Sequence, residues 1–169
     1  MDSKELSLNR ENVNFAPFIN EIIDRFEMNE KDGNIEFRRV IPKTDLDVWI
    51  DKDRMTQVLD NIISNAIKYS PDGGTITCKV EKRIGQIVVS VKDEGIGIEY
   101  EKLDKIFDRF YRVDKARTRQ LGGTGLGLAI TRELVEAHYG KIWANSIEGK
   151  GTTIYFTLPL IKNKRRHES

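Results

Sequence analysis

The chain has 169 residues, 38% of them hydrophobic and 33% charged, and a formal net charge of +1 at pH 7, which fits one soluble globular domain with its own core. The nearly balanced charge excludes a general attraction to nucleic acid or to an anionic membrane, and no apolar run approaches the ~20 residues of a membrane-spanning helix. The single cysteine, Cys78, excludes an internal disulfide and is expected to be buried, and His138 and His167 have no metal-ligand spacing.

The first half of the chain predicts two amphipathic helices and two strands. After a polar start, apolar side chains recur at helical spacing over residues 15–26. Residues 35–39 and 46–50 alternate between apolar and polar, and we expect these two strands to be antiparallel. Asp51 is suited to cap a second helix that ends near Tyr69. The apolar face of that helix consists of Met55, Val58, Leu59, Ile62, Ile63 and Ala66.

The second predicted helix also carries a polar stripe. Asn61, Asn65 and Lys68 are spaced at i, i+4 and i+7, so they lie on one side of the helix. Asparagine is a mediocre helix former, and two in register beside a lysine, at the border of the apolar face, indicate a polar site at the edge of the core. A solvated helix face is the alternative.

The middle of the chain predicts a hairpin that ends in a carboxylate. Its strands, residues 75–83 and 86–93, are joined near Gly85, and Asp93 is the last member of the apolar row of the second strand. A carboxylate in that position needs a hydrogen-bond donor if it is buried. The exocyclic amine of a purine would serve, and a simple turn aspartate is the alternative. We expect Gly95 and Gly97, just after it, to leave room for a flat ring.

A charged, aromatic segment over residues 99–121 is predicted to be a lid, because long irregular connections are usually disordered or functional. It leads into the glycine run of residues 122–128, after which apolar residues recur at helical spacing, so a helix begins inside or just after the glycines. Free N–H groups at a helix start suit a phosphate. A loop with an ordinary helix cap is the alternative.

Two common glycine motifs do not fit this run or the later one. A dinucleotide fingerprint would need a glycine where the chain has Ile130 or Arg132, and a P-loop would need one at Ala144. Gly140 is expected to cap the helix that the run opens. A final hairpin is expected from residues 141–158.

Four blocks, in this order, resemble the ATP-binding catalytic domain of bacterial sensor histidine kinases, within the superfamily of gyrase, chaperone and MutL ATPases. Residues 61–69 are similar to the N box, 93–97 to the first glycine box, 107–110 to the F box and 123–127 to the second glycine box. A late glycine–threonine element at residues 149–152 adds to the match. Each block alone is a weak signal, whereas all of them in order are specific.

The resemblance implies an α/β (α+β) fold, a two-layer sandwich with helices on one face of a mixed, mostly antiparallel sheet, known as the Bergerat-type ATP-binding fold. It implies a linker remnant at residues 1–14, the catalytic domain at 15–160 and a flexible tail at 161–169. A complete kinase also has a dimerisation domain with a phosphoacceptor histidine, whose context neither His138 nor His167 has. We therefore expect an excised, monomeric, cytoplasmic catalytic domain.

The resemblance also implies partners. They are a histidine-bearing dimerisation domain of the same kinase and a response regulator downstream, with no nucleic acid. The parent protein is expected to be a homodimer anchored in the cell membrane.

The site implied by the resemblance binds ATP and Mg²⁺ between the N-box helix and the lid. By position, Asn65 would bind Mg²⁺ through its amide oxygen, a hard ligand, and Asn61 would support the metal and the phosphates. Lys68 would contact a phosphate, and Tyr69 would pack near the nucleotide. Catalysis is assigned to Asn61 with two lid residues, Arg109 and Arg112, whose guanidinium groups would stabilise the γ-phosphate.

The remaining implied contacts surround the base and the phosphates. Asp93 would accept a hydrogen bond from the adenine amine, with Thr152 nearby through water. Backbone N–H groups of the glycine run would hold the phosphates. The other expected nucleotide contacts are Gly95, Gly97, Ile98, Tyr111, Gly123, Thr124, Gly125, Leu126, Gly127 and Leu128.

Three other classes of protein remain as alternatives. An anti-sigma-type serine kinase is also a single nucleotide domain without a histidine helix, although residues 107–112 favour a histidine kinase. An ATP-hydrolysing relative usually has a glutamate four residues before the metal-binding asparagine, where this chain has Asn61, and an amide is no general base. A non-catalytic module would not bind nucleotide at all.

Overall fold

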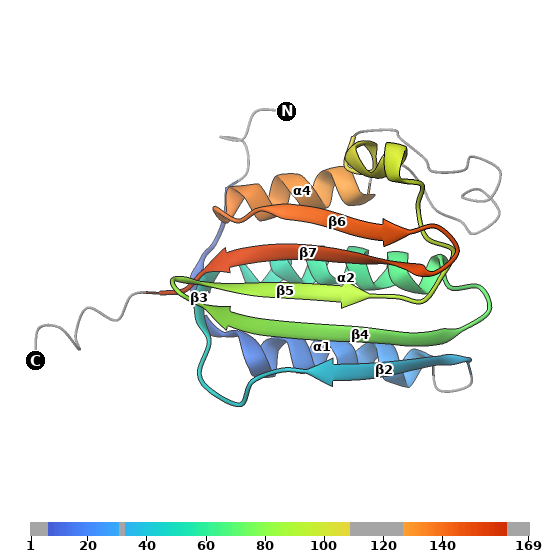
Figure 1. Cartoon of the computed structure of the whole chain (residues 1–169). Coiled ribbons are helices and arrows are strands. Elements are labelled where there is room, and N and C mark those ends of the chain that lie inside the picture. Colours follow the sequence, from blue (N-terminus) through green and yellow to red (C-terminus); the bar gives the residue numbers. More distant parts are fainter. Residues whose placement is uncertain (1–6, 31–32, 109–126, 162–169) are drawn as a thin grey trace, which may run out of the picture.

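The computed structural model describes residues 7–30, 33–108 and 127–161. Five strands form one sheet in the order β2-β4-β5-β7-β6 (Figure 1). The β2–β4 pair is parallel and the pairs β4–β5, β5–β7 and β6–β7 are antiparallel, which confirms the predicted mixed, mostly antiparallel sheet. The strands are β2 (Ile35–Val40), β4 (Gly74–Arg83), β5 (Gln86–Lys92), β6 (Ile142–Ile147) and β7 (Gly151–Pro159).

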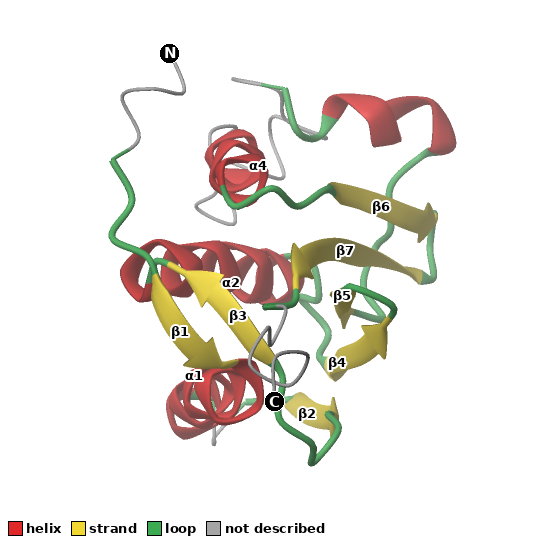
Figure 2. Cartoon of the chain, turned by 90° about the vertical axis from the view of Figure 1, so that its left-hand side faces the viewer, coloured by secondary structure: helices red, strands yellow, loops and turns green. Residues whose placement is uncertain are grey.

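The α-helices of the described residues lie against one face of the sheet, as the side view in Figure 2 shows. They are α1 (Phe15–Asn29), α2 (Lys52–Lys68) and α4 (Gly127–Ala137), and a short 3-10 helix, η2 (Tyr100–Lys105), follows β5 in the chain. This two-layer arrangement confirms the α/β sandwich.

The α2 helix begins where the sequence predicts. Asp51 is its N-cap, and the carboxylate accepts a hydrogen bond from the Arg54 N–H at 3.1 Å. Burial would raise the pKa of Asp51, but N–H groups of Asn9, Arg54 and Asp53 outweigh it and hold that pKa below its usual value. All six predicted apolar-face residues are buried, and burying a large aliphatic side chain contributes roughly 1.5–3 kcal/mol. The face is therefore the main reason that α2 is held on the sheet.

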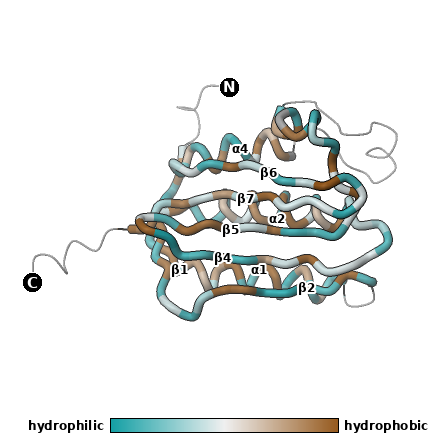
Figure 3. The backbone as a smooth tube through the Cα atoms, in the orientation of Figure 1, coloured by the Kyte–Doolittle hydropathy of each residue, from teal (hydrophilic) through white to brown (hydrophobic). Residues whose placement is uncertain are grey.

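The strands supply the other half of the core. Hydrophobic and hydrophilic positions alternate along them (Figure 3), because successive side chains point to opposite faces of a sheet. Cys78 is fully buried on the inner face of β4, and burial raises the pKa of its thiol to about 12. This confirms the predicted packing role and leaves no thiolate for chemistry near neutral pH.

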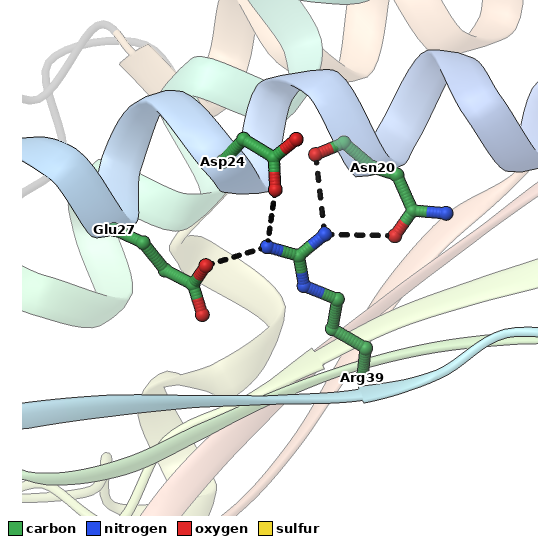
Figure 4. Close-up of polar contacts among 4 residues, drawn as sticks. All are labelled: Asn20, Asp24, Glu27 and Arg39. Atoms are coloured by element: carbon green, nitrogen blue, oxygen red, sulfur yellow. Dashed lines mark hydrogen bonds and ion pairs between the residues drawn. The ribbon is translucent and has the colours of Figure 1, made fainter.

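Arg39 fastens the edge strand β2 to α1 (Figure 4). Its Nη2 lies 2.7 Å from Asp24 Oδ1 and 2.6 Å from Glu27 Oε1, and its Nη1 donates to Asn20 Oδ1 at 2.9 Å. Burial would lower the pKa of Arg39, but the two carboxylates outweigh it and raise that pKa above its usual value. The charge-assisted bonds hold the last strand of the sheet under the helix layer.

The predicted antiparallel pairing between residues 35–39 and 46–50 is wrong. β2 instead pairs in parallel with β4, while β3 (Asp47–Ile50) pairs antiparallel with β1 (Glu11–Asn14) in a separate two-stranded sheet. Alternation of apolar and polar residues gives the buried face of a strand but not its partner. Residues 11–14, assigned to a linker from the sequence, are thus paired in this second sheet.

Both ends of the described chain meet β3. β1 pairs with it along Glu11–Asn14. From the C-terminal end, Leu160 forms an isolated bridge with Val48, and the Ile161 N–H donates to the Asp47 carbonyl at 2.9 Å. β3 therefore lies between the segment that enters the fold and the segment that leaves it.

The C-terminal end of α4 is capped by Tyr139 rather than by Gly140. Tyr139 has φ +66°, and the Gly140 N–H donates to the Val135 carbonyl while the Tyr139 N–H donates to that of Glu136, which is a Schellman motif. Gly140 is required for another reason, since a Cβ there would lie 1.9 Å from the Thr157 carbonyl oxygen.

Arg10 anchors the entering segment to this helix end. Its Nη2 donates to the Ala137 carbonyl at 2.5 Å, and its guanidinium lies 5.3 Å from the centre of the Tyr139 ring. A cation near the last carbonyls of a helix is favourable because the helix dipole is negative there.

Candidate functional site

Backbone hydrogen bonds join the end of α2, the loop of residues 93–98 and the turn between β6 and β7. The Ile96 N–H donates to the Tyr69 carbonyl at 3.0 Å, and the Gly149 N–H donates to the Ile96 carbonyl at 2.7 Å. Three blocks far apart in the sequence, the N box, the first glycine box and the late glycine–threonine element, thus meet at one end of the sheet (Figure 1).

Gly95 and Gly97 serve this meeting of backbones. A Cβ on Gly95 would lie 1.8 Å from the Tyr69 carbonyl oxygen, and one on Gly97, which has φ +74°, would lie 2.2 Å from that of Ile147. The expectation that these glycines leave room for a flat ring is therefore wrong in its reason, because neighbouring backbone fills the space of the absent side chains. A role of the two residues in nucleotide binding stays a prediction.

Asp93 is buried, with 5% of its surface exposed, at the start of this loop. Its Oδ1 accepts hydrogen bonds from the N–H groups of Gly95 at 2.9 Å and Thr152 at 3.1 Å, while its Oδ2 has no hydrogen-bond partner in the described part of the chain. Burial raises the pKa of Asp93 to about 6, although the two N–H donors act to lower it. One carboxylate oxygen is thus available to a donor from a ligand.

Thr152 lies opposite Ser146 in the β6–β7 ladder and is 8% exposed. Its Oγ1 is 2.8 Å from Ser146 Oγ, which in turn contacts the Gly151 carbonyl at 2.9 Å and the Ile98 N–H at 2.7 Å. Three predicted site residues, Asp93, Ile98 and Thr152, therefore belong to one hydrogen-bonded cluster.

The polar stripe of α2 is half-buried, as predicted for residues at the border of the core. This holds for Asn61, Asn65 and Lys68, and for Tyr69 just after the helix. Asn61 Nδ2 donates to Thr131 Oγ1 at 3.1 Å, and Thr131 is fully buried in α4. Asn61 thus links the N-box helix to the helix that the glycine run opens.

Gly127, the last glycine of the run, is the first described residue of α4, and Leu128 packs against the core, whereas the residue at which the helix begins stays a prediction. At the other end of the predicted lid, Ile106 and Phe107 are buried. The remaining predicted residues of this segment lie outside the described residues; they are Arg109, Tyr111, Arg112, Gly123, Thr124, Gly125 and Leu126.

Sequence reasoning missed Thr131 and Ser146. Nothing in the sequence relates Thr131 to Asn61, because their contact depends on how two helices pack. The contact of Ser146 with Thr152 could have been predicted from the sequence. The predicted final hairpin places the two residues opposite each other, and facing residues of an antiparallel pair share one side of the sheet.

A hollow of about 770 Å³ lies elsewhere on the molecule, between β1, α1 and the start of α2. None of the predicted site residues lines it. We therefore define the candidate site by the buried hydrogen-bonded cluster rather than by this hollow.

A family model described as the histidine kinase-, DNA gyrase B- and HSP90-like ATPase matches residues 50–162. The chain belongs to this family. The matched segment runs from the start of α2 to the end of β7 and contains every block on which the resemblance rests.

Curated relatives give a finer likeness. The chain is 61% identical over 160 residues to the sensor histidine kinase WalK of Bacillus subtilis (strain 168), covering 94% of this chain and 26% of that protein. It is 53% identical over 161 residues to the sensor protein kinase WalK of Staphylococcus aureus, covering 94% of this chain and 38% of that protein. These matches confirm the likeness to WalK that residues 112–117 and 146–153 indicate, and the chain spans well under half the length of these relatives.

Solved structures confirm the fold. The catalytic domain of histidine kinase ThkA superposes with a TM-score of 0.79 at 32% identity, covering 90% of this chain and 97% of that one. The mycobacterial sensor histidine kinase MprB gives a TM-score of 0.76 at 27% identity, covering 90% and 98%. The Bergerat-type fold is therefore shared with histidine kinase catalytic domains.

Two properties of the described residues bear on membranes and metal ions. No helix among them is long and apolar enough to cross a membrane. They also contain no group of three or more His, Cys, Asp or Glu side chains that could hold a metal ion. The donors fit Mg²⁺ only if phosphates and water supply most ligands beside an amide oxygen such as that of Asn65, which is how Mg²⁺ is commonly bound with nucleotides.

Proposed function

We propose that this chain binds Mg²⁺-ATP and donates the γ-phosphoryl group to a histidine on a separate dimerisation domain of a two-component sensor kinase. The observation that carries the proposal is the buried Asp93 carboxylate, held by two N–H groups through Oδ1 with Oδ2 left over. Because Asp93 is only 5% exposed, a donor from a ligand would replace the small solvent contact that this oxygen has left. The adenine amine is a donor of the required kind.

The N-box helix is proposed to serve the phosphate end of the nucleotide. Asn65 would hold the metal ion and Asn61 would support it, while Lys68 would contact a phosphate and Tyr69 would pack near the nucleotide. When bound, Mg²⁺ neutralises charge on the phosphates. These side chains are half-buried at the border of the core face of α2, which supports a polar site that is partly shielded from water.

The lid and the glycine run are proposed to act on the transferred group. Backbone N–H groups from Gly123 to Leu128 would hold the phosphates at the start of α4, where the helix dipole favours negative charge. Arg109 and Arg112 would stabilise the γ-phosphoryl group in the transition state. The helical conformation of the described residues that directly follow the run, Gly127–Ala137, supports this arrangement.

The acceptor histidine is proposed to come from a separate domain. His138 is 2% exposed, its Nε2 accepts from the Asp51 N–H at 3.1 Å, and its Nδ1 donates to the Leu134 carbonyl at 2.7 Å. Burial also lowers the pKa of this imidazole. With both ring nitrogens used inside the fold, His138 is not available for phosphorylation.

Relatives support the wider assignment. A solved structure of histidine kinase ThkA in complex with response regulator protein TrrA contains a chain that is 31% identical to this one. The two superpose with a TM-score of 0.75, covering 90% of this chain and 42% of that one. By this likeness we propose a response regulator as the downstream partner. We further propose that the parent is a membrane-anchored homodimer with this domain on its cytoplasmic side.

Hydrolysis of ATP is the second candidate, and the site disfavours it. The side chain at the position of the usual glutamate is Asn61, whose amide donates to Thr131 in α4. A neutral amide cannot take a proton from water.

The test is binding followed by transfer. Calorimetry should show Mg²⁺-ATP binding that Asp93→Ala weakens about tenfold or more, and labelled phosphate should move to an added histidine-bearing dimerisation domain. A Lys82→Gln variant, changed at an exposed position near the C-terminal end of β4, is the control. Transfer to an added anti-sigma antagonist instead of the histidine domain would establish the serine kinase, and lack of any nucleotide binding would refute the proposal.

A further inference from the structure

The Ser146 hydroxyl has three hydrogen-bond partners, and two of them have fixed directions. The Ile98 N–H, at 2.7 Å, can only donate to Ser146 Oγ. The Gly151 carbonyl, at 2.9 Å, can only accept, so the single hydroxyl proton of Ser146 points to it. The third partner is Thr152 Oγ1 at 2.8 Å.

The direction of the third bond follows by counting protons. A serine hydroxyl has one proton and two acceptor lone pairs. The proton is used by Gly151 and one lone pair by Ile98, so Thr152 must donate its own hydroxyl proton to the remaining lone pair. Thr152 Oγ1 then has no proton left and offers only lone pairs to any ligand.

The same end of the cluster contains a second acceptor. The Thr152 N–H donates to Asp93 Oδ1 and the Asp93 N–H donates to the Thr152 carbonyl, so the two residues are bonded neighbours. Asp93 Oδ2, like Thr152 Oγ1, can accept from a ligand when the carboxylate is ionised. Neither group can donate to one.

We propose that Ser146 is a positioning residue that sets the specificity for the base. By accepting the hydrogen bond from the Thr152 hydroxyl, it leaves Thr152 and Asp93 able only to accept hydrogen bonds from the base. This favours a 6-aminopurine over a 6-oxopurine. The inference rests on the proposed function, since it needs the base to lie at this cluster. The 6-amino group of adenine supplies donors, whereas the 6-oxo group of hypoxanthine needs a donor and finds none. The same holds if one water bridges both acceptors, because its two protons then go to Thr152 Oγ1 and Asp93 Oδ2 and none is left for a 6-oxo group.

Removing the Ser146 hydroxyl should allow Thr152 to donate a hydrogen bond to the base. In Ser146→Ala the Thr152 hydroxyl is free to rotate and donate to a 6-oxo group. We expect the ratio of ITP affinity to ATP affinity to rise about tenfold. ITP is the probe because it lacks the 2-amino group of GTP and so isolates the change at position 6.

Matched variants separate positioning from packing. Ser146 also holds the Ile98 N–H, so a loss of loop order alone would weaken ATP and ITP equally and leave their ratio unchanged. Ser146→Thr keeps a hydroxyl and should keep the wild-type ratio. Thr152→Val removes the reading group while keeping the shape, so it should weaken ATP without gaining ITP, and Ser146→Ala should have no effect on the ratio in that background.

The experiment is calorimetric titration of each variant with Mg²⁺-ATP and Mg²⁺-ITP, with thermal melting to check the fold. Ser146→Cys keeps the shape of the side chain but replaces the oxygen by the larger sulfur, a poor hydrogen-bond partner, so it provides the same test if the alanine variant does not fold. An unchanged ITP/ATP ratio in a folded variant, with ATP binding intact in the wild type, overturns the role of Ser146 alone. If the wild type binds neither nucleotide, the proposed function itself fails.

Discussion

The charge of Asp93 should make the empty protein less stable as pH rises, and Asp93→Asn tests this. Burial raises the pKa of Asp93 from 3.8 to about 6, and one pKa unit corresponds to ~1.36 kcal/mol. Between these two pH values the folded protein holds a proton that the unfolded chain has released, so the free energy of unfolding falls as pH rises through this window. The loss amounts to about 3 kcal/mol above pH 6 and is absent below pH 4.

The asparagine variant removes this dependence. Its side-chain oxygen can still accept from Gly95 and Thr152, but its amide does not titrate. A fixed offset from burying the amide group affects all pH values alike. Therefore the difference in stability between variant and wild type should shift in favour of the variant by about 3 kcal/mol from pH 4 to pH 8.

Urea unfolding of both proteins without nucleotide, at intervals from pH 4 to pH 8, measures the shift. The control is Gln86→Asn, a change at an exposed position of β5, whose curve should run parallel to that of the wild type because neither side chain titrates. Parallel curves for Asp93→Asn as well would refute the reasoning, because Asp93 would then ionise as easily in the folded protein as in the unfolded chain. Wild-type ATP affinity should also decrease below pH 6, where the carboxyl group becomes protonated.

Three further outcomes are expected. Asn65→Ala should reduce the Mg²⁺ dependence of ATP binding more than it reduces binding itself, because phosphates and water supply most of the ligands of the ion. ATP affinities measured with Mg²⁺ and with EDTA test this. An unchanged contribution of the metal to affinity would show that Asn65 is not the ligand. Arg109→Ala and Arg112→Ala should slow phosphoryl transfer to a supplied dimerisation domain with little effect on ATP binding. The reason is that losing a group that acts only on the migrating phosphoryl lowers the rate constant alone. Lost ADP affinity would instead assign the arginine to the diphosphate. The isolated chain should bind Mg²⁺-ATP without releasing phosphate or phosphorylating itself. ATP at a hundredfold excess over its dissociation constant should stabilise the fold by about 2.7 kcal/mol. Rapid phosphate release that is abolished by changing Asn61 would indicate an ATPase.

Local chemistry explains which parts of the fold the sequence predicts. Asp51 caps α2 as expected because capping preferences act within a few residues. The β4–β5 hairpin follows from its alternation and from the turn at Gly85. The parallel partner of β2 and the strand β1 escape such reasoning, since any strand with one apolar face fits several neighbours.

The candidate site divides in the same way. Asp93 is recognisable because a carboxylate that ends an apolar row requires a donor, and its burial confirms that part of the interpretation. Ser146 and Thr131 act through bonds to other elements, so their contribution appears only when the elements are packed. Gly95 shows the remaining difficulty, because a glycine in sequence does not say whether ligand or backbone fills the space it leaves.

The position of β3 between the two chain ends has a mechanical consequence. A tension applied between the N-terminal and C-terminal sides of the fold would pass from Glu11–Asn14 across β3 to Leu160 and Ile161, rather than along the five-stranded sheet. The β1–β3 ladder would therefore bear the load before the five-stranded sheet does. For the same reason, a protein shortened to start at Phe15 would lose β1, so the smallest unit that keeps β3 bonded on both sides begins at or before Glu11 and includes Ile161.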